Sequence, residues 1–338
     1  MEKIVFGKTG LEVSRVSFGA LPIQRVSMDT AKKLLQKAYK NGINFFDTAR
    51  LYTDSEEKIG NALSSVRKEI IIATKTHAKD ADTFWEHLET SLNNLKTDYI
   101  DIYQFHNPDS LPVNEDELYG AMLEAKNNGY IRHIGITSHS IEIAREAVQS
   151  GLYETIQYPF NYLSTNEEIN LSLLCKDNNI GFIAMKALSG GLITNAEAAF
   201  SFIWNYPHVV PIWGIQRETE LDRFIDLEKN PPPIDEEMKN LIEKDKKELS
   251  GNFCRGCGYC LPCPADIPIP MAARMKFMLR RAPYEDFITN EWKENMERIE
   301  NCIECGHCLN NCPYHLNTPE LLREMLADYR TFVMNNED

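Results

Sequence analysis

Eight of the nine cysteines in this chain of 338 residues lie between Cys254 and Cys312. They form two runs, Cys254-x-x-Cys257-x-x-Cys260-x-x-Cys263-Pro264 and Cys302-x-x-Cys305-x-x-Cys308-x-x-x-Cys312-Pro313. The first residues, MEKIVFGKTG, lack the apolar stretch of a signal peptide, so we expect a cytoplasmic protein whose thiols stay reduced. In that setting, so dense a group of cysteines indicates a metal framework rather than disulfides.

The second run has the spacing of a bacterial ferredoxin, in which three cysteines bind one 4Fe–4S cluster and the fourth binds the neighbouring cluster. The first run has two residues rather than three before its last cysteine. Because that thiolate is donated to the other cluster, we expect the shorter spacing to tilt the geometry and to keep the ligand. Two structural zinc sites of four cysteines are the alternative, although zinc needs neither the third cysteine nor the following proline. The scheme predicts two ligand sets, Cys254, Cys257, Cys260 and Cys312 for one cluster, and Cys302, Cys305, Cys308 and Cys263 for the other.

Four polar residues nearer the start of the chain are suited to acid–base chemistry: Asp47, Tyr52, Lys75 and His106. A phenol with the ordinary pKa of about 10 is a poor acid–base catalyst at neutral pH. We expect a nearby ammonium to lower the pKa of the phenol and a carboxylate to keep that ammonium charged. An imidazole beside them can orient a carbonyl oxygen while the phenol protonates it. Taken singly, the four have simpler explanations: a helix cap, a rim side chain, a strand end and a core histidine.

Apolar, β-branched and aromatic segments alternate with amphipathic helical patterns along the cysteine-poor part of the chain. This alternation predicts a (β/α)8 TIM barrel, whose active site lies at the C-terminal ends of the strands. Asp47, Lys75 and His106 follow the second, third and fourth predicted strands, so one rim gathers them. An open doubly wound sheet shares the alternation, but no GxGxxG follows the first strand. The predicted strands are 16–19, 43–46, 70–73, 100–103, 133–136, 155–158, 182–185 and 209–212, with helices over 28–40, 83–95 and 167–178.

The chain is expected to contain two domains. Three consecutive prolines, 231–233, cannot continue a helix or a central strand, so we place the boundary after residue 234. Residues 1–234 form the barrel, which a short hairpin over 3–6 and 12–15 precedes. Residues 235–338 form a mainly helical, ferredoxin-like iron–sulfur domain, with helices expected over 271–281 and 284–299.

The polar residues occur in segments that resemble the Asp–Tyr–Lys–His tetrad of the aldo-keto reductase superfamily. These segments are Phe46-Asp47-Thr48-Ala49-Arg50-Leu51-Tyr52, Ala73-Thr74-Lys75 and Gln104-Phe105-His106, and GKTGLEVS at residues 7–14 and YIRHIGI at 130–136 are similar as well. The resemblance implies an NAD(P)H-dependent reductase or dehydrogenase in which Tyr52 is the general acid, Lys75 and Asp47 tune it, and His106 orients the substrate carbonyl. The C-terminal segment resembles the dicluster ferredoxin module of one branch of that superfamily, which shares the shortened first run.

The same resemblance implies a set of cofactor-binding residues. Thr137, Ser138 and Gln157 would hold the nicotinamide carboxamide, and Gly19, Ala20 and Leu21 would line the cofactor. Met185 stands where many members carry an aromatic residue. In the loop after the eighth strand, Gly214 and Glu220 stand where a lysine and an arginine usually bind the 2′-phosphate of NADPH. Gln216 and Arg217 lie in that loop too, and Arg217 is close enough to replace those cations. The acidic side chain of Glu220, however, would repel the 2′-phosphate, which favours NADH over NADPH.

The composition limits the partners. With 36 basic and 50 acidic side chains, the formal net charge is −14, which argues against a nucleic-acid partner. No apolar segment reaches the roughly 18 residues of a membrane span, so we expect no membrane partner. The expected substrate is a small carbonyl compound or alcohol, and an external electron carrier is a further expected partner. The alternative function is an iron–sulfur electron-transfer or redox-sensing protein whose barrel binds a nucleotide or a partner with little carbonyl chemistry.

Overall fold

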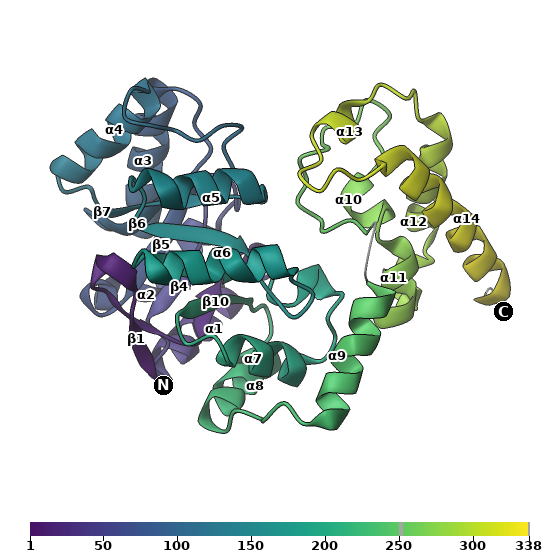
Figure 1. Cartoon of the computed structure of the whole chain (residues 1–338), viewed down its shortest axis with the longest axis horizontal. Coiled ribbons are helices and arrows are strands. Elements are labelled where there is room, and N and C mark those ends of the chain that lie inside the picture. Colours follow the sequence, from purple (N-terminus) through teal and green to yellow (C-terminus); the bar gives the residue numbers. More distant parts are fainter. Residues whose placement is uncertain (250–252, 337–338) are drawn as a thin grey trace. The chain divides into compact units, whose positions relative to one another are not determined.

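The computed structural model describes residues 1–249 and 253–336, and its larger part is a closed barrel of parallel strands (Figure 1). The strands follow one another around the barrel in chain order, and the last, β10, pairs with the first, β3. The TIM-barrel prediction is therefore confirmed. The strands are β3 (Ser17–Gly19), β4 (Phe45–Asp47), β5 (Ile71–Thr76), β6 (Ile100–His106), β7 (Ile131–Thr137), β8 (Thr155–Pro159), β9 (Gly181–Met185) and β10 (Val209–Gly214).

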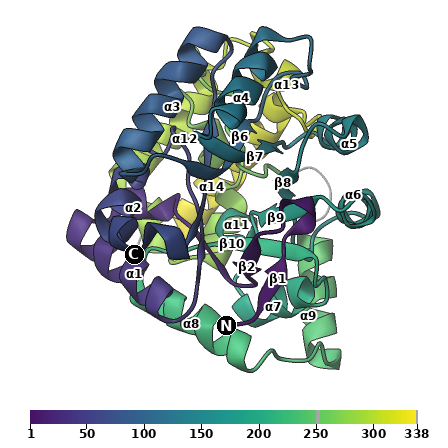
Figure 2. The same cartoon turned by 90° about the vertical axis from the view of Figure 1, so that its left-hand side faces the viewer.

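A two-stranded hairpin closes the N-terminal end of the barrel (Figure 2). Its strands β1 (Lys3–Val5) and β2 (Glu12–Ser14) pair antiparallel, as the sequence predicts. Phe6 and Val13 of this segment pack against inward-facing side chains near the strand starts, among them Phe45 and Ile102. These apolar side chains fill the N-terminal end of the barrel, so polar side chains can be accommodated at its C-terminal end.

Helices follow the barrel strands and surround them (Figure 2). Short polar side chains begin several of these helices: Ser27 accepts a hydrogen bond from the Thr30 backbone N–H at 3.2 Å, and Thr165 forms a capping box with Glu168. The helices of this part are α1 (Met28–Lys40), α2 (Ser55–Leu63), α3 (Ala81–Leu95), α4 (Glu117–Asn127), α5 (Ile141–Ser150), α6 (Asn166–Asp177), α7 (Ala196–Trp204) and α8 (Glu218–Lys229).

The register of the barrel strands places polar residues in neighbouring positions. Lys75 of β5 lies opposite Gln104 of β6, and His106 lies opposite Thr137 of β7. Thr137 in turn lies opposite Gln157 of β8. Because parallel strands run in the same direction, these residues gather toward the C-terminal end of the barrel, where TIM-barrel sites form.

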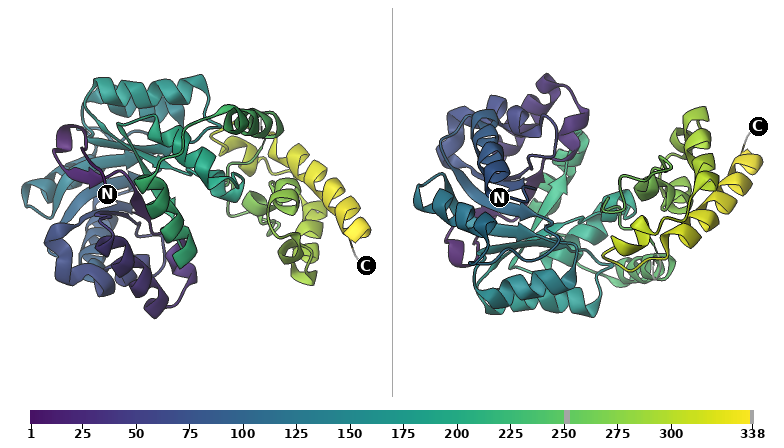
Figure 3. Two further views of the ribbon diagram at one scale, coloured as in Figure 1. Left: turned by 90° about the horizontal axis from the view of Figure 1, so that it is seen from below. Right: turned by 90° about the horizontal axis from the view of Figure 1, so that it is seen from above.

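The chain divides into two compact units, Met1–Ala187 with Glu197–Asp235, and Leu188–Ala196 with Glu236–Asp338. The second unit is mainly helical, and its longest helix, α14, contacts the shorter helices of the same unit (Figure 3). The sequence predicts one helix over 271–281, but the structure interrupts it at Ala273 and Arg274. The helices are α9 (Glu236–Glu248), α10 (Ile269–Ala272), α11 (Met275–Arg281), α12 (Asn290–Glu297), α13 (His307–Asn310) and α14 (Thr318–Asn336).

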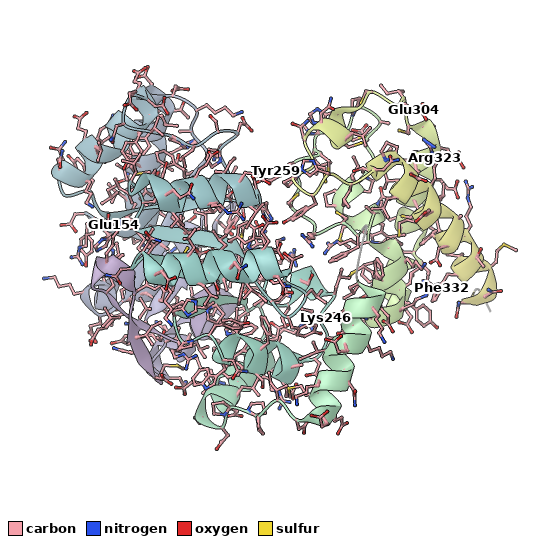
Figure 4. All side chains as sticks on the ribbon, in the orientation of Figure 1. Glu154, Lys246, Tyr259, Glu304, Arg323 and Phe332 are labelled. Carbon is pink, nitrogen blue, oxygen red and sulfur yellow. The ribbon has the colours of Figure 1, made fainter. Side chains whose placement is uncertain are left out.

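Aliphatic and sulfur-containing side chains form the core of the second unit. Met275 and Met296 are wholly buried, and Leu322 of α14 packs in the same cluster as Cys254 and Cys260. A small unit of this kind buries little apolar surface, and such units commonly depend on a metal centre for stability. Ion pairs lie on its surface, for example Arg323 with Glu304 at 2.8 Å (Figure 4).

Within residues 1–249 and 253–336, no helix combines the length and the apolar character that crossing a lipid bilayer requires.

Candidate active site

A buried ion pair lies at the C-terminal end of neighbouring strands β4 and β5. The Lys75 ammonium donates to the Asp47 carboxylate at 2.6 Å and to the Thr48 carbonyl oxygen at 2.6 Å. The Lys75 side chain is 0% exposed and the Asp47 side chain is 2% exposed. Charges this deeply buried are tolerated only when they are paired and hydrogen-bonded. The pairing therefore fixes both side chains in one arrangement.

The loop after β4 brings Tyr52 to this pair. The loop is closed by a hydrogen bond between the Thr48 and Ser55 hydroxyls at 2.9 Å, at the start of α2. The Lys75 Nζ atom lies 5.4 Å from the centroid of the Tyr52 ring. The imidazole of His106, at the end of β6, meets the same phenol ring edge to face, with centroids 5.9 Å apart. The structure thus gathers Asp47, Tyr52, Lys75 and His106 in one place, as the sequence predicts.

The pKa of Tyr52 moves in the opposite direction to the sequence-based expectation. Burial raises the pKa of the Tyr52 phenol above its usual value, and the Asp47 carboxylate raises it further. Lys75 approaches the aromatic ring, and its charge is compensated by Asp47. The expectation that the ammonium lowers the pKa of Tyr52 is therefore wrong for this geometry. The phenol keeps its proton at neutral pH.

Burial also shifts the pKa values of Asp47, Lys75 and His106. Burial raises the pKa of the Asp47 carboxyl and lowers the pKa of the Lys75 ammonium, while each charge opposes the shift of its partner. The pKa of His106 lies well below its usual range because of burial first and the Lys75 charge second. Its imidazole is therefore neutral at pH 7 and can donate one N–H to an oxygen atom.

Gln104 is a residue of this network that the sequence analysis missed. Its amide nitrogen donates to the Gln157 side-chain oxygen at 3.1 Å and approaches the Asp47 carboxylate at 3.5 Å. Gly135, opposite Gln104 in β7, provides the space: a Cβ there would lie 2.8 Å from the Gln104 Cγ atom. Gln104 stands two residues before His106, and this period-2 spacing is the signal that places both on one strand face.

Glu56 on α2 is a second missed residue. Its carboxylate is 1% exposed, accepts from the Thr74 hydroxyl at 2.7 Å, and forms an ion pair with Arg50. Arg50 lies in the loop that carries Tyr52, and its backbone N–H donates to the Lys75 carbonyl oxygen at 3.0 Å. These contacts tie the loop to β5. No signal in the sequence marks Glu56, because its burial is visible only in the structure.

The residues expected to line a cofactor lie around the same rim. Gly19 and Gly214 are opposite each other in β3 and β10, and a Cβ on Gly19 would lie only 3.0 Å from the Trp213 carbonyl oxygen. The Ala20 backbone N–H donates to the Asp47 carbonyl oxygen at 2.8 Å, and Leu21 is 37% exposed. The small residues here let the ends of β3 and β10 lie close together.

The predicted carboxamide ligands stand at the ends of β7 and β8. The Thr137 hydroxyl donates to the Asn107 side-chain oxygen at 3.1 Å. The Ser138 backbone N–H donates to the Gln157 carbonyl oxygen at 3.0 Å, which fixes the two residues against each other. Met185 ends β9 and is largely buried. The set lies on consecutive strands, next to the residues of the ion pair.

The loop after β10 contains a carboxylate at a helix N-terminus. Glu220 in the first turn of α8 accepts from the backbone N–H groups of Gln216 at 2.9 Å and Arg217 at 3.0 Å. Such N–H groups are a common binding site for phosphate. Here the Glu220 carboxylate already accepts from these N–H groups, so a phosphate bound at the same place would be repelled by its negative charge.

Five of the clustered cysteines line one cavity in the second unit: Cys260, Cys263, Cys302, Cys305 and Cys308. Four of them, all except Cys260, are the ligand set predicted for one cluster, including Cys263 from the first run. Cys312, which is predicted to bind the other cluster together with Cys260, does not line this cavity. Cys254 and Cys257 act electrostatically on Cys260, which places these three thiols together as well.

The arrangement of the thiols fits the ligands of an iron–sulfur cluster better than the ligands of a single metal ion. In the part of the chain that the structure describes, no three His, Cys, Asp or Glu side chains converge as ligands of one metal ion do. A cubane binds one thiolate at each of four iron atoms, so its ligands line a cavity instead. Burial raises the pKa of the Cys260 thiol to about 12. An iron centre would supply the positive charge that its thiolate form needs.

Comparisons with known proteins agree with both units. The family profile of the aldo/keto reductase family matches residues 3–201, which is more than half of the chain. The chain belongs to the aldo/keto reductase family. A second profile, described as a 4Fe-4S dicluster domain, matches residues 253–317. This aldo/keto reductase family member thus carries an iron–sulfur domain after its barrel, and the resemblance stated from the sequence is confirmed.

Individual relatives match the barrel part of this aldo/keto reductase. The aldo-keto reductase YhdN of Bacillus subtilis is 34% identical over 218 residues, covering 57% of this chain and 64% of YhdN, so the match spans somewhat less than two thirds of that relative. The NADH-specific methylglyoxal reductase of Escherichia coli is 28% identical over 69% of this chain and 81% of its own length. The holo form of an aldo-keto reductase from Bacillus halodurans shares the fold, with a TM-score of 0.63 at 22% identity, over 72% of this chain and 96% of its own.

Proposed function

We propose that the barrel of this protein is an NAD(P)H-dependent carbonyl reductase or alcohol dehydrogenase in which Tyr52 is the general acid. The observation that carries the proposal is the buried ion pair of Lys75 and Asp47, with the rings of Tyr52 and His106 beside it. Family membership supports oxidoreductase chemistry of this kind. The bound nicotinamide supplies or accepts the hydride.

Side chains of the site, Tyr52 above all, transfer the proton to the substrate oxygen. Tyr52 holds a proton at neutral pH because its pKa is raised. An alkoxide formed from a carbonyl oxygen is a much stronger base than a phenolate, so the proton still passes from Tyr52 to that oxygen. Lys75 then lies near the new phenolate and stabilises its charge. Neutral His106 donates an N–H to the substrate oxygen and holds it in place.

For the cofactor, we assign the carboxamide contacts to Thr137, Ser138 and Gln157, and the rim of the binding site to Gly19, Ala20, Leu21, Met185 and Gly214. The position of Glu220 supports NADH over NADPH, since its carboxylate occupies N–H groups at the start of α8. The E. coli relative described as NADH-specific supports the same preference. Arg217 lies in the same loop, three residues before Glu220.

We propose that the domain after residue 234 holds two 4Fe–4S clusters. Cys263, Cys302, Cys305 and Cys308 bind one of them, as their common cavity supports. Cys254, Cys257, Cys260 and Cys312 bind the other. Bound clusters would supply single-electron chemistry, and we propose an external electron carrier as the partner of this domain. Reduced thiols and iron–sulfur chemistry suit the cytoplasm, where we place the protein.

Deuterium transfer tests the reductase assignment. Protein purified without oxygen is mixed with NADH or NADPH carrying two deuterium atoms at C4 and a panel of small aldehydes, and the alcohols are analysed by mass spectrometry. We expect alcohol carrying one deuterium on the carbinol carbon, formed in equal amount to the NADH consumed. If neither NADH nor NADPH gives labelled alcohol with any aldehyde, the barrel is not a carbonyl reductase.

Iron and acid-labile sulfide test the cluster assignment. Two cubanes contain about eight iron and about eight sulfide atoms per chain. One zinc atom for each of the two four-cysteine sites, with no acid-labile sulfide, would instead show that the cysteines bind structural zinc.

A further inference from the structure

Arg274 is a buried arginine in the iron–sulfur unit. Its side chain is among the buried charged groups, with 7% exposure, just before α11. Its Nε atom donates to the Pro270 carbonyl oxygen at 2.8 Å, and its Nη1 atom donates to the Gly190 carbonyl oxygen at 3.2 Å. Its Nη2 atom lies 3.2 Å from the Met271 sulfur. The guanidinium is thus fixed by neutral groups on several sides.

Two glycines make room for this guanidinium. A Cβ on Gly256 would lie 3.1 Å from the Arg274 Cζ atom, and a Cβ on Gly190 would lie 2.8 Å from its Nη1 atom. Gly256 stands between Cys254 and Cys257, and its N–H donates to the Cys254 sulfur at 3.3 Å. The guanidinium therefore lies against the backbone of the first cysteine run.

The charge of Arg274 lacks a carboxylate partner among the residues that the structure describes. Burial lowers the pKa of Arg274, and Cys254 is the charged neighbour that opposes this shift. Arginine nevertheless keeps its proton in proteins. A buried cation without a counter-ion is strongly unfavourable. Within residues 1–249 and 253–336, the anionic group beside Arg274 is the Cys254 thiolate.

The two arginines at the end of α11 differ from Arg274 in this respect. Arg280 pairs with both oxygens of Asp328, and Arg281 pairs with Asp245 and Glu248. Arg281 also donates to the Leu192 carbonyl oxygen at 3.0 Å, in the same segment that Arg274 contacts through Gly190. Arg281 therefore provides a matched control with similar backbone contacts and its own counter-ions.

We propose that Arg274 is the counter-ion of the cluster bound by Cys254, Cys257, Cys260 and Cys312, and that it raises the reduction potential of this cluster. The inference rests on the proposed cluster assignment. On reduction the cluster takes one electron from an external reductant, and its net negative charge grows by one. A fixed positive charge nearby stabilises the reduced form more than the oxidised form, which raises the potential.

A redox titration tests this role. The holoprotein, purified without oxygen, is titrated with dithionite and mediators while EPR spectra follow both clusters. In Arg274→Gln, one of the two midpoint potentials should shift to more negative values while the other changes much less. Arg274→Lys, which keeps the charge, should stay closer to the wild type than Arg274→Gln. Arg281→Gln should leave both potentials unchanged.

Unchanged potentials in Arg274→Gln, or an equal shift in Arg274→Lys, would overturn the proposal. The iron content of each variant serves as a second measurement if a cluster is lost. Loss of about half the iron in Arg274→Gln but not in Arg274→Lys supports a counter-ion role, whereas equal loss in both variants contradicts it. Absence of clusters from the wild-type protein would refute the cluster assignment itself, which is a different result.

Discussion

Lys75 and Asp47 form an ion pair of 2.6 Å across neighbouring strands, and both side chains are almost completely excluded from solvent. The pair holds the ammonium at a fixed place near the Tyr52 ring and extends through Gln104 to Gln157. A single buried network thus joins the proposed proton donor to a proposed cofactor ligand. The position of each group depends on the others.

Removing one member of the ion pair should destabilise the barrel more than removing both. Lys75→Met leaves the Asp47 carboxylate buried without a partner, which we expect to reduce the free energy of unfolding by about 3–5 kcal/mol. In the double variant Lys75→Met/Asp47→Asn, the buried charge is gone and part of this loss should return. Urea unfolding followed by fluorescence measures both values. Equal stability of the single and double variants would argue against a charged pair.

Carbonyl reduction should depend little on pH across the neutral range. Tyr52 is protonated below its raised pKa, and His106 is neutral above its lowered pKa. Neither group changes its protonation state between about pH 6 and about pH 9, so kcat/KM should stay nearly constant there. The measurement is kcat/KM for an aldehyde at saturating NADH. A decline with an apparent pKa of about 8 would show that Tyr52 titrates much lower than the structure indicates.

Cofactor preference should respond to Glu220. Replacing its carboxylate by an amide in Glu220→Gln removes the negative charge at the start of α8, where Gln216 and Arg217 donate their N–H groups. We expect kcat/KM with NADPH to rise about tenfold relative to NADH, which corresponds to about 1.4 kcal/mol. The control is Glu218→Gln, a neighbouring exposed acid in the same turn. An equal change in both variants would point to a general charge effect.

Acid should weaken the barrel partly through Glu154, which lies in the first unit (Figure 4). Burial alone would raise the pKa of Glu154, but hydrogen bonds from His133, Lys126 and the Ile134 N–H outweigh it and lower the pKa to about 2. A carboxylate with a lowered pKa stabilises the fold above its unfolded pKa, and this contribution is lost as pH falls from about 5 toward 2.

The variant Glu154→Gln lacks that contribution. At pH 7 it should be less stable than the wild type by roughly 1–2 kcal/mol, and the difference should shrink as the pH falls from about 5 toward 2. Paired unfolding measurements at each pH cancel acid effects on the C-terminal unit. A difference that stays constant with pH would show that the charge of Glu154 does not matter.

Much of the fold followed from local sequence patterns. The strands that end at Asp47 and His106 were predicted because apolar alternation and strand length are local properties. The grouping of Leu188–Ala196 with the C-terminal unit was not predicted, because it depends on contacts such as Arg274 with Gly190 between distant parts of the chain. The interruption of the helix before α11 is likewise not encoded in any proline or glycine there.

The candidate site was predictable in its members but not in its electrostatics. Asp47, Lys75 and Tyr52 could be placed on one rim from strand order alone. The raised pKa of Tyr52 could not be predicted from the sequence, because it depends on burial and on the charge of Asp47 rather than on residue type. Arg274 was also missed, since a lone arginine beside a helix gives no sign of its burial or of the lack of a carboxylate partner among the described residues.

The proton-donor role of Tyr52 is tested most directly by Tyr52→Phe, with Tyr103→Phe as the control. Tyr103 is another buried phenol of the barrel, on β6, and burial raises its pKa as well. The measurement is kcat for aldehyde reduction together with the Kd for NADH from fluorescence titration. We predict that Tyr52→Phe lowers kcat by about 10²–10⁴-fold with little change in Kd, while Tyr103→Phe keeps kcat near the wild-type value. A Tyr52→Phe variant that retains wild-type kcat would contradict the account.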